Sequence, residues 1–153
     1  MPNTYTQIYI QIVFTVKGKH NLIPSEYREE LQKYITGIIQ NRDNKLLSIY
    51  IMPDHTHIFI GLNPSLSISD LVKDIKAISS KYINDNNWFK EKFHWQTGFG
   101  AFSYSKSQID NVVKYFLNQE EHHKKKTFRE EYIEFLKKFE IDYVDKYLFE
   151  WIE

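Results

Sequence analysis

Two histidines, His55 and His57, stand one residue apart in a segment whose side chains alternate as they do in a β-strand. Side chains at positions i and i+2 of a strand share a face, so both histidines and Phe59 point one way and Thr56 and Ile58 the other. Two neutral imidazoles aimed at one point supply two nitrogen ligands, which is half of a metal site. The alternative is a pair of surface or core histidines without a ligand, and this pattern alone does not separate the two.

A tyrosine and a glutamine one helical turn apart form the second group of candidate residues. The segment from Ser107 to about His122 begins with a capping-box pattern and has helical periodicity. Tyr115 and Gln119 fall on its polar side, one above the other. They suggest a nucleophile beside a neutral oxygen donor, or else an amphipathic tyrosine on a wet surface. The apolar side of this predicted helix is formed by Ile109, Val113, Phe116 and Leu117.

Composition limits the remaining possibilities. The chain has 153 residues, which suits one domain spanning residues 1–153, and 42% hydrophobic residues are enough for a core. Twenty Lys plus Arg balance 20 Asp plus Glu, so binding of nucleic acid would depend on local basic patches. The absence of cysteine excludes disulfides and thiolate chemistry. With no signal peptide in the polar Met1–Gln7 and no apolar run near ~20 residues, we expect a cytoplasmic protein that does not contact a membrane.

The periodicities predict four or five strands with helices between them. Helices are expected to begin at Ser25, Ser67, Ser107 and Thr127, each with an N-capping residue. Strands are expected over residues 8–16, 46–52, 55–61, 93–96 and 99–104, and Pro53-Asp54 joins the second and third as an antiparallel hairpin. We therefore predict an α+β fold, an antiparallel sheet with helices packed on one face, in a ferredoxin-like arrangement.

Three motifs follow one another along the chain. They are Met52-Pro53-Asp54-His55-Thr56-His57, Trp95-Gln96-Thr97-Gly98-Phe99-Gly100 and Tyr115-Phe116-Leu117-Asn118-Gln119-Glu120-Glu121-His122-His123. In this order they resemble the single-tyrosine HUH transposases of bacterial and archaeal insertion sequences, from the first strand to His123. In one departure, Thr56 stands where the family has a bulky apolar residue. Because Thr56 should face away from the metal, we interpret it as a packing change.

The resemblance implies a function for four of these residues. His55, His57 and Gln119 match the metal ligands, and Tyr115 matches the nucleophile. The implied metal is Mg²⁺ or Mn²⁺, whereas two imidazoles by themselves favour manganese or zinc. The implied reaction cleaves and rejoins single-stranded DNA at hairpin-flanked element ends through a 5′-phosphotyrosine. Two transesterifications need no nucleotide fuel, and no G-x-x-x-x-G-K-[ST] pattern is present.

The family also works as a homodimer, in which the tyrosine helix of one subunit reaches the histidines of the other. Gly98 and Gly100 would let that helix move, although a tight turn explains them equally well. The sequence does not say whether Tyr115 acts within its own subunit. Candidate contacts to DNA phosphates, each equally well explained as a solvated helix face or a basic helix end, are Lys73, Lys76, Lys81, Lys124, Lys125 and Lys126.

Three other functions fit some of these residues. A replication-initiator or relaxase-like nickase would make the same cut without joining two ends. A non-mobile relative would process or only bind repetitive palindromes, and pure binding would not require an intact Tyr115. A metal hydrolase built on His55 and His57 would not require the tyrosine either.

Overall fold

Within residues 3–152, which the computed structural model describes, four strands form one antiparallel sheet. The strands are β1 (Tyr9–Thr15), β2 (Lys45–Ile51), β3 (His55–Gly61) and β4 (Gly100–Tyr104), in the order β2-β3-β1-β4. Helix α1 (Arg28–Asn41) joins β1 to β2, and α2 (Ile68–Asp85) joins β3 to β4. This is the ferredoxin-like βαββαβ order, so the predicted α+β class is confirmed. Residues 1–2 and 153 of the predicted 1–153 domain lie outside the described range.

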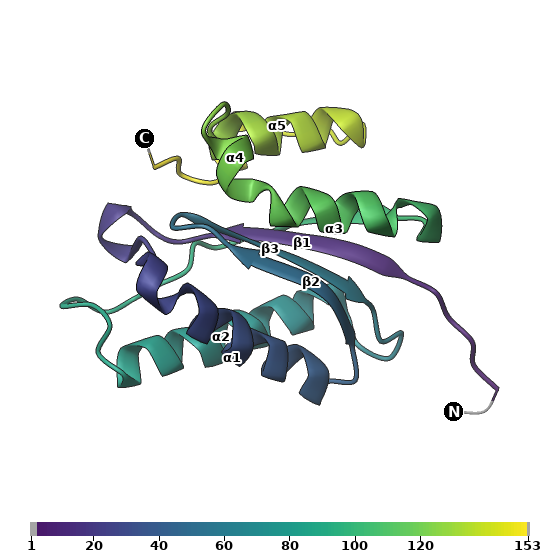
Figure 1. Cartoon of the computed structure of the whole chain (residues 1–153), viewed down its shortest axis with the longest axis horizontal. Helices are drawn as coiled ribbons and strands as arrows, with labels where there is room; N and C mark the ends of the chain where they lie inside the picture. The colour runs from purple at the N-terminus through teal and green to yellow at the C-terminus, as the bar shows by residue number, and fades with distance from the viewer. Residues whose placement is uncertain (1–2, 153) are drawn as a thin grey trace.

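Helices cover both faces of the sheet, where the prediction placed them on one (Figure 1). Helices α1 and α2 lie on one face, and α3 (Ile109–Leu117), α4 (Gln119–His123) and α5 (Phe128–Lys138) lie on the other. The second layer is needed because the face that carries the histidines also carries Val13, Phe59 and Phe102, which must be buried.

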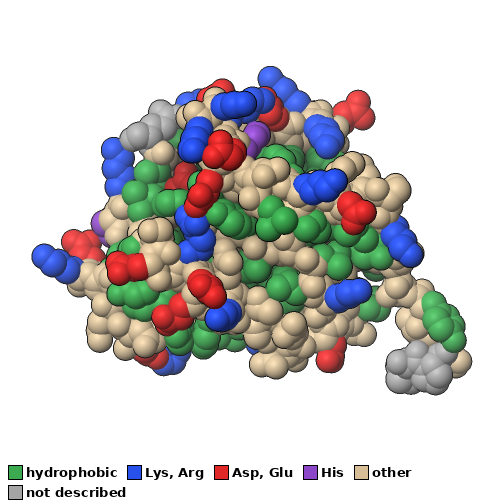
Figure 2. Space-filling view, viewed as in Figure 1, with side chains coloured by type: hydrophobic (Ala, Val, Ile, Leu, Met, Phe, Trp, Pro, Cys, Tyr) green, Lys and Arg blue, Asp and Glu red, His purple; other side chains and the backbone are tan. Residues whose placement is uncertain are grey.

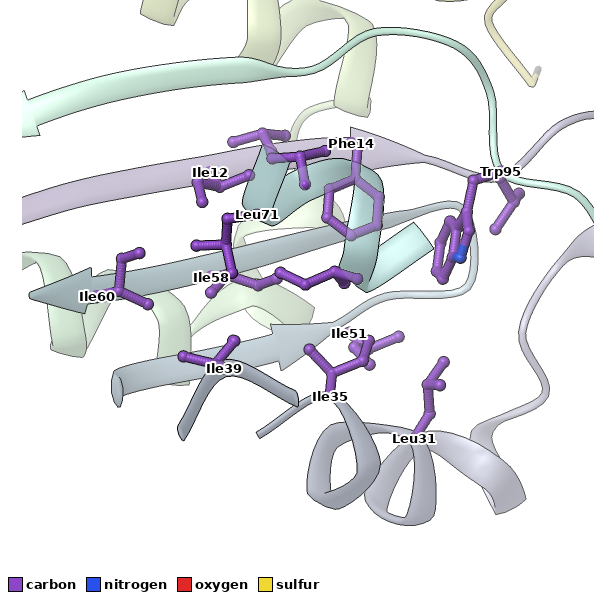
Figure 3. Close-up of a cluster of buried hydrophobic side chains, with 14 of the residues drawn as sticks. Ile12, Phe14, Leu31, Ile35, Ile39, Ile51, Ile58, Ile60, Leu71 and Trp95 are labelled. Carbon is purple, nitrogen blue, oxygen red and sulfur yellow. The ribbon is translucent and has the colours of Figure 1, made fainter. Parts of the chain in front are cut away.

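The larger core cluster has its aliphatic part between the sheet and helices α1 and α2 (Figure 3), and it continues to residues of α5 on the other face. Alternate residues of β1 and β3 point into it, as their period of two predicts. Burying each large aliphatic or aromatic side chain contributes about 1.5–3 kcal/mol to folding. Its fully buried members include Ile12, Phe14, Leu31, Ile35, Ile39, Ile58, Ile60 and Leu71.

The tyrosine helix α3 is rotated relative to the prediction. Val112 and Phe116 are its buried residues and pack on Phe59, whereas Leu117 is 69% exposed. The rotation follows from α5, whose Phe135 ring lies 5.9 Å from the ring of Tyr115. Tyr115, which the sequence placed on the polar side of α3, therefore faces α5 and is half-buried between the two helices.

This helix also begins and ends at different residues from those predicted. A capping box of Ser105 and Gln108 begins the 3₁₀ turn Lys106–Gln108 that leads into α3, and Ser107 is not the cap. Helix α3 ends at Leu117, and Asn118 separates it from α4. Gln119, the first residue after this break, is fully buried, and its Oε1 atom lies 3.1 Å from Nε2 of His123.

Of the other three predicted helix starts, two agree with the structure and one does not. The Ser67 side chain accepts a hydrogen bond from the Asp70 amide, and Thr127 forms a capping box with Glu130. Ser25 instead lies in a 3₁₀ turn ahead of α1, which has no side-chain cap. The expected strand over residues 93–96 is reduced to an isolated bridge between Trp95 and Val16.

The second motif has structural uses. The Gln96 side chain donates hydrogen bonds to the carbonyls of Val16 and Glu150, at 3.0 and 2.7 Å, and so ties down the C-terminal segment. Gly98 has a positive φ of 91°, as a tight turn requires. A Cβ at Gly100 would lie 2.6 Å from the Tyr132 hydroxyl oxygen, so Gly100 lets α5 approach the sheet. No helix among the described residues has the length and apolar content that crossing a membrane requires.

Candidate metal and tyrosine site

The histidine pair lies at the start of β3, next to the centre of the sheet. His57 pairs with Val13 of β1 on one side and Tyr50 of β2 on the other. Both imidazoles are buried, and their Nε2 atoms lie 3.6 Å (His55) and 3.1 Å (His57) from the same oxygen of Glu131. The strand alternation thus aims both histidines at one point, as the sequence predicted.

Helix α4 brings an amide and a third imidazole to that point. The Oε1 atom of Gln119 lies 3.4 Å from Nε2 of His55 and 3.1 Å from Nε2 of His123. Gln119 is fully buried, which is unusual for an amide without a specific role. Burial lowers the pKa of His123 to about 4 and holds the pKa of His57 well below its usual value. Both rings are therefore neutral at pH 7, the form in which imidazole binds metals.

Two further side chains orient the histidines from behind. The Asp54 carboxylate lies 2.6 Å from Nδ1 of His55, which leaves Nε2 of that ring for a ligand. Burial opposes ionisation of Asp54, but the hydrogen bond from His55 and its charge keep the pKa of this carboxyl below its usual value. The Gln11 amide lies 2.9 Å from Nδ1 of His57 and accepts a hydrogen bond from the Tyr104 hydroxyl. The sequence analysis assigned Asp54 only to the hairpin turn and did not predict its contact with His55.

The tyrosine hydroxyl reaches this cluster within one chain. Tyr115 donates a hydrogen bond to Oε2 of Glu131, and its hydroxyl lies 3.2 Å from Nε2 of His122. The rings of Tyr115 and His57 are 6.0 Å apart. The structure thus brings together all four residues that the resemblance selected, namely His55, His57, Gln119 and Tyr115.

The donor set suits a divalent cation. The ligand atoms of His55, His57, His123 and Glu131 all lie within 4.8 Å of one another. Neutral nitrogen donors combined with carboxylate and amide oxygens are acceptable to Mn²⁺ and Zn²⁺, and the oxygens also suit Mg²⁺. Burial raises the pKa of Glu131 to about 8, so a cation beside this carboxyl would favour its ionised form. The buried residues therefore fit a divalent metal ion.

Sequence reasoning missed two members of this cluster. His123 was noticed within the third motif but received no role as a ligand. Glu131 was not singled out, although a signal was present: it stands on the apolar side of α5, between Phe128 and Phe135 at helical spacing. A carboxylate on a core-facing stripe is rare unless it has a partner, and here its partners are the site residues.

Thr56 faces the opposite side of the sheet from the histidines and is fully buried. Its hydroxyl oxygen has no hydrogen-bond partner among the described residues. The residue is thus a packing feature of the larger core, as the alternation of β3 indicated, and it does not contact the site.

The candidate DNA-contacting lysines occupy two opposite sides of the sheet. Lys76 on α2 donates to the carbonyls of Gln96 and Gly98, and burial lowers its pKa to about 8. Lys81 pairs with Asp85 on the same helix. Lys124 and Lys126 pair with Glu121 and Glu134 on the side of the sheet that carries Tyr115. Figure 2 shows Lys and Arg side chains over α4 and α5, at the top of this view, with acidic side chains among them.

The fold is a ferredoxin-like sheet that presents two histidines to a helix carrying a tyrosine. Comparison with known proteins identifies the protein family that has this fold and site. Residues 4–119 match the family described as Transposase IS200 like, and the chain belongs to this family.

Individual proteins and solved structures are also similar to the chain. The chain is 23% identical over 118 residues to the ISDra2 transposase TnpA of Deinococcus radiodurans, covering 74% of this chain and 84% of that protein. Its fold is similar to a putative transposase from Deinococcus radiodurans R1, with a TM-score of 0.59 and 19% identity over 76% of this chain and 94% of the other. It is also similar to a REP-associated tyrosine transposase bound to a REP hairpin, with a TM-score of 0.60 and 14% identity over 79% of this chain and 72% of the other.

Proposed function

We propose that this protein is a metal-dependent tyrosine transposase that cleaves and rejoins single-stranded DNA at hairpin-flanked ends. The observation that carries the proposal is the meeting of the Tyr115 hydroxyl with the buried cluster around His55, His57 and Gln119. A nickase would use the same cluster. A metal hydrolase would have no use for the tyrosine.

In this proposal Tyr115 is the nucleophile. Its oxygen attacks the phosphorus of the scissile phosphodiester, a 5′-phosphotyrosyl bond forms and the 3′ oxygen leaves as a free hydroxyl. A divalent cation held by His55, His57 and Gln119 would neutralise charge on the phosphate and polarise a phosphoryl oxygen. A 3′-hydroxyl of another strand then attacks the phosphotyrosine, releases Tyr115 and reseals the DNA.

A DNA strand would have room beside the Tyr115 hydroxyl. A pocket of about 250 Å³ is lined by Gln11, Tyr104, Asn111, Tyr115 and Phe135, among others. The exposed Asn111 amide can hydrogen-bond a base edge, and the aromatic rings of the pocket can stack on a base. We therefore propose that the nucleotide next to the scissile phosphate lies in this pocket.

We further propose that Lys124, Lys125 and Lys126 contact the DNA backbone, because they follow α4 on the face that holds Tyr115. Replacing all three by Gln should weaken binding of hairpin DNA and reduce its salt dependence. The logarithmic salt slope should fall by about 0.7–0.9 for each phosphate that the variant no longer neutralises. Fluorescence anisotropy at several salt concentrations measures this.

The matched comparison replaces Lys73 and Lys81, which lie on α2 across the sheet from Tyr115. Replacing Lys73 and Lys81 should change the salt slope of DNA binding by less than the triple replacement does. If instead the pair costs more affinity than the triple variant, the DNA path runs over α2 and our proposed path is wrong. Lys76 is left intact in both variants because its ammonium already holds two backbone carbonyls.

A homodimer is proposed for the joining step. One copy already places Tyr115 beside its own histidines, so a single cut does not require a second copy. Exchanging strands between two DNA ends requires two sites, and a two-fold dimer supplies them in a fixed relation. Light scattering with and without hairpin DNA measures whether two copies associate.

A second candidate function is supported by one comparison. A structural neighbour of this chain, at 14% identity, is a REP-associated tyrosine transposase bound to a REP hairpin. Processing of repetitive palindromes without mobility would use the same chemistry on a different substrate. Strand transfer between two distant element ends separates the two functions.

The test of the proposed function uses single-stranded DNA that carries a short hairpin, with Mn²⁺ or Mg²⁺. We expect a covalent protein–DNA adduct that survives denaturing electrophoresis and does not form when a chelator removes the metal beforehand. The same sequence as a perfect duplex should give far less adduct. Equal adduct from duplex DNA, or cleavage without any adduct, would contradict the proposal.

A further inference from the structure

The two carboxylate oxygens of Glu131 face two different halves of the site. Oε1 lies 3.1 Å from Nε2 of His57 and 3.3 Å from Nε2 of His123, on the side of the candidate ligands. Oε2 accepts the hydrogen bond of the Tyr115 hydroxyl and lies 3.3 Å from Nε2 of His122. A single side chain therefore touches both the ligand cluster and the nucleophile.

Several features of the chain fix Glu131 in this place. Its side chain is 2% exposed, and the capping box of Thr127 and Glu130 begins helix α5 one turn earlier. Tyr132 follows Glu131 in the sequence. Because Gly100 has no side chain, Tyr132 can pack against the sheet and hold this part of α5 in place. Helix α5 lies beyond residues 4–119, the part of the chain that matches the family, so the family assignment gives Glu131 no role.

We propose that Glu131 is a bridging catalytic residue, in which one oxygen is an additional ligand of the divalent cation and the other positions and deprotonates Tyr115. This inference rests on the proposed function. A carboxylate adds a charged oxygen donor to the neutral imidazoles and amide, which favours hard cations such as Mn²⁺ and Mg²⁺. Because the same carboxylate contacts both the candidate ligands and the Tyr115 hydroxyl, it would hold the nucleophile beside the bound cation.

The proton and bond changes balance without a further reactant except water. As the Tyr115 oxygen forms its bond to phosphorus, its proton passes to Oε2 of Glu131. The bond between phosphorus and the 3′ oxygen breaks, and that oxygen takes a proton from water. In the rejoining step the proton on Glu131 returns to the oxygen of Tyr115 as the phosphotyrosine bond breaks, and the attacking 3′-hydroxyl gives its proton to the hydroxide left in the first step.

The test measures metal binding and adduct formation separately in Glu131→Gln, which keeps the size of the side chain and removes its charge. Calorimetric titration with Mn²⁺ in the absence of DNA should show at least about a tenfold loss of affinity. With Mn²⁺ saturating, the single-turnover rate of adduct formation on hairpin DNA should fall by about 10²–10⁴-fold. Glu134→Gln makes the same charge change one turn along α5 on an exposed position, and both quantities should stay within about twofold of wild type.

The outcomes separate this inference from the proposed function. If Tyr115→Phe abolishes the adduct while Glu131→Gln alters neither quantity, the function stands and the bridging role is wrong. A loss of metal affinity alone, or of rate alone, also overturns it, because the bridge requires both. If Glu131→Gln fails to fold by circular dichroism, Glu131→Asp is measured instead. Its shorter side chain cannot span both contacts, so at least about a tenfold loss in one quantity is expected, and wild-type values would overturn the proposal.

Discussion

Replacing Tyr115 with Phe should abolish the covalent protein–DNA adduct while leaving hairpin DNA bound. The substitution removes one oxygen atom, which the proposal makes the attacking nucleophile. Loss of a nucleophile lowers the rate by at least about 10³-fold in enzymes of known mechanism. Single-turnover assays on labelled hairpin DNA measure the rate, and anisotropy measures binding.

Tyr132→Phe is the matched control for this prediction. Tyr132 is a buried tyrosine near the sheet, and burial raises its pKa to about 12, but it is not among the residues of the candidate metal site. Adduct formation should continue in this variant. If Tyr115→Phe cleaves and attaches DNA as wild type does, Tyr115 is not the nucleophile.

The second large effect concerns the proposed metal ligands. With Mn²⁺ at about a hundred times its dissociation constant, wild-type protein should gain about 2.7 kcal/mol of stability, because the ion binds only the folded chain. For a protein of this length that corresponds to roughly 5–10 °C in Tm. In His57→Ala the gain should vanish, together with adduct formation, because one of the two strand imidazoles is removed. Differential scanning fluorimetry with and without Mn²⁺ measures the shift.

His94→Ala removes an exposed histidine outside the site and should keep the full metal-dependent shift. The comparison matters because His57→Ala also leaves a cavity and lowers the stability of the metal-free protein. The difference between Tm values with and without metal cancels that effect. An undiminished shift in His57→Ala would show that the metal binds elsewhere.

Short-range patterns in the sequence correctly predicted the part of the site that the β-sheet contributes. The alternation of His55, Thr56 and His57 placed both imidazoles on one face, since a strand leaves no other arrangement. The hairpin at Pro53-Asp54 and the ferredoxin-like order followed from local turn and periodicity signals. These features depend on contacts close in the sequence, which is why they could be predicted.

The part of the site that the helices contribute depends on packing between distant elements, and the sequence predicted it less well. Periodicity placed Leu117 on the apolar side of the helix and Tyr115 on its polar side, yet Tyr115 packs against α5 and Leu117 is exposed. The break at Asn118, which turns Gln119 and His123 inward, has no strong local signal such as proline. Glu131 stands on the apolar side of α5, but its partners in the cluster come from distant elements, so these contacts became visible only in the structure.

The most direct test of the central claim is mass spectrometry of the trapped adduct after nuclease trimming and digestion with trypsin. Cleavage after Lys114 and Lys124 releases the peptide Tyr115–Lys124, in which Tyr115 carries the only hydroxyl side chain. The account predicts that this peptide carries the mass of the trimmed 5′-phosphorylated nucleotide on Tyr115. DNA cleaved while this peptide stays unmodified, or a nucleotide found on another residue, would contradict it.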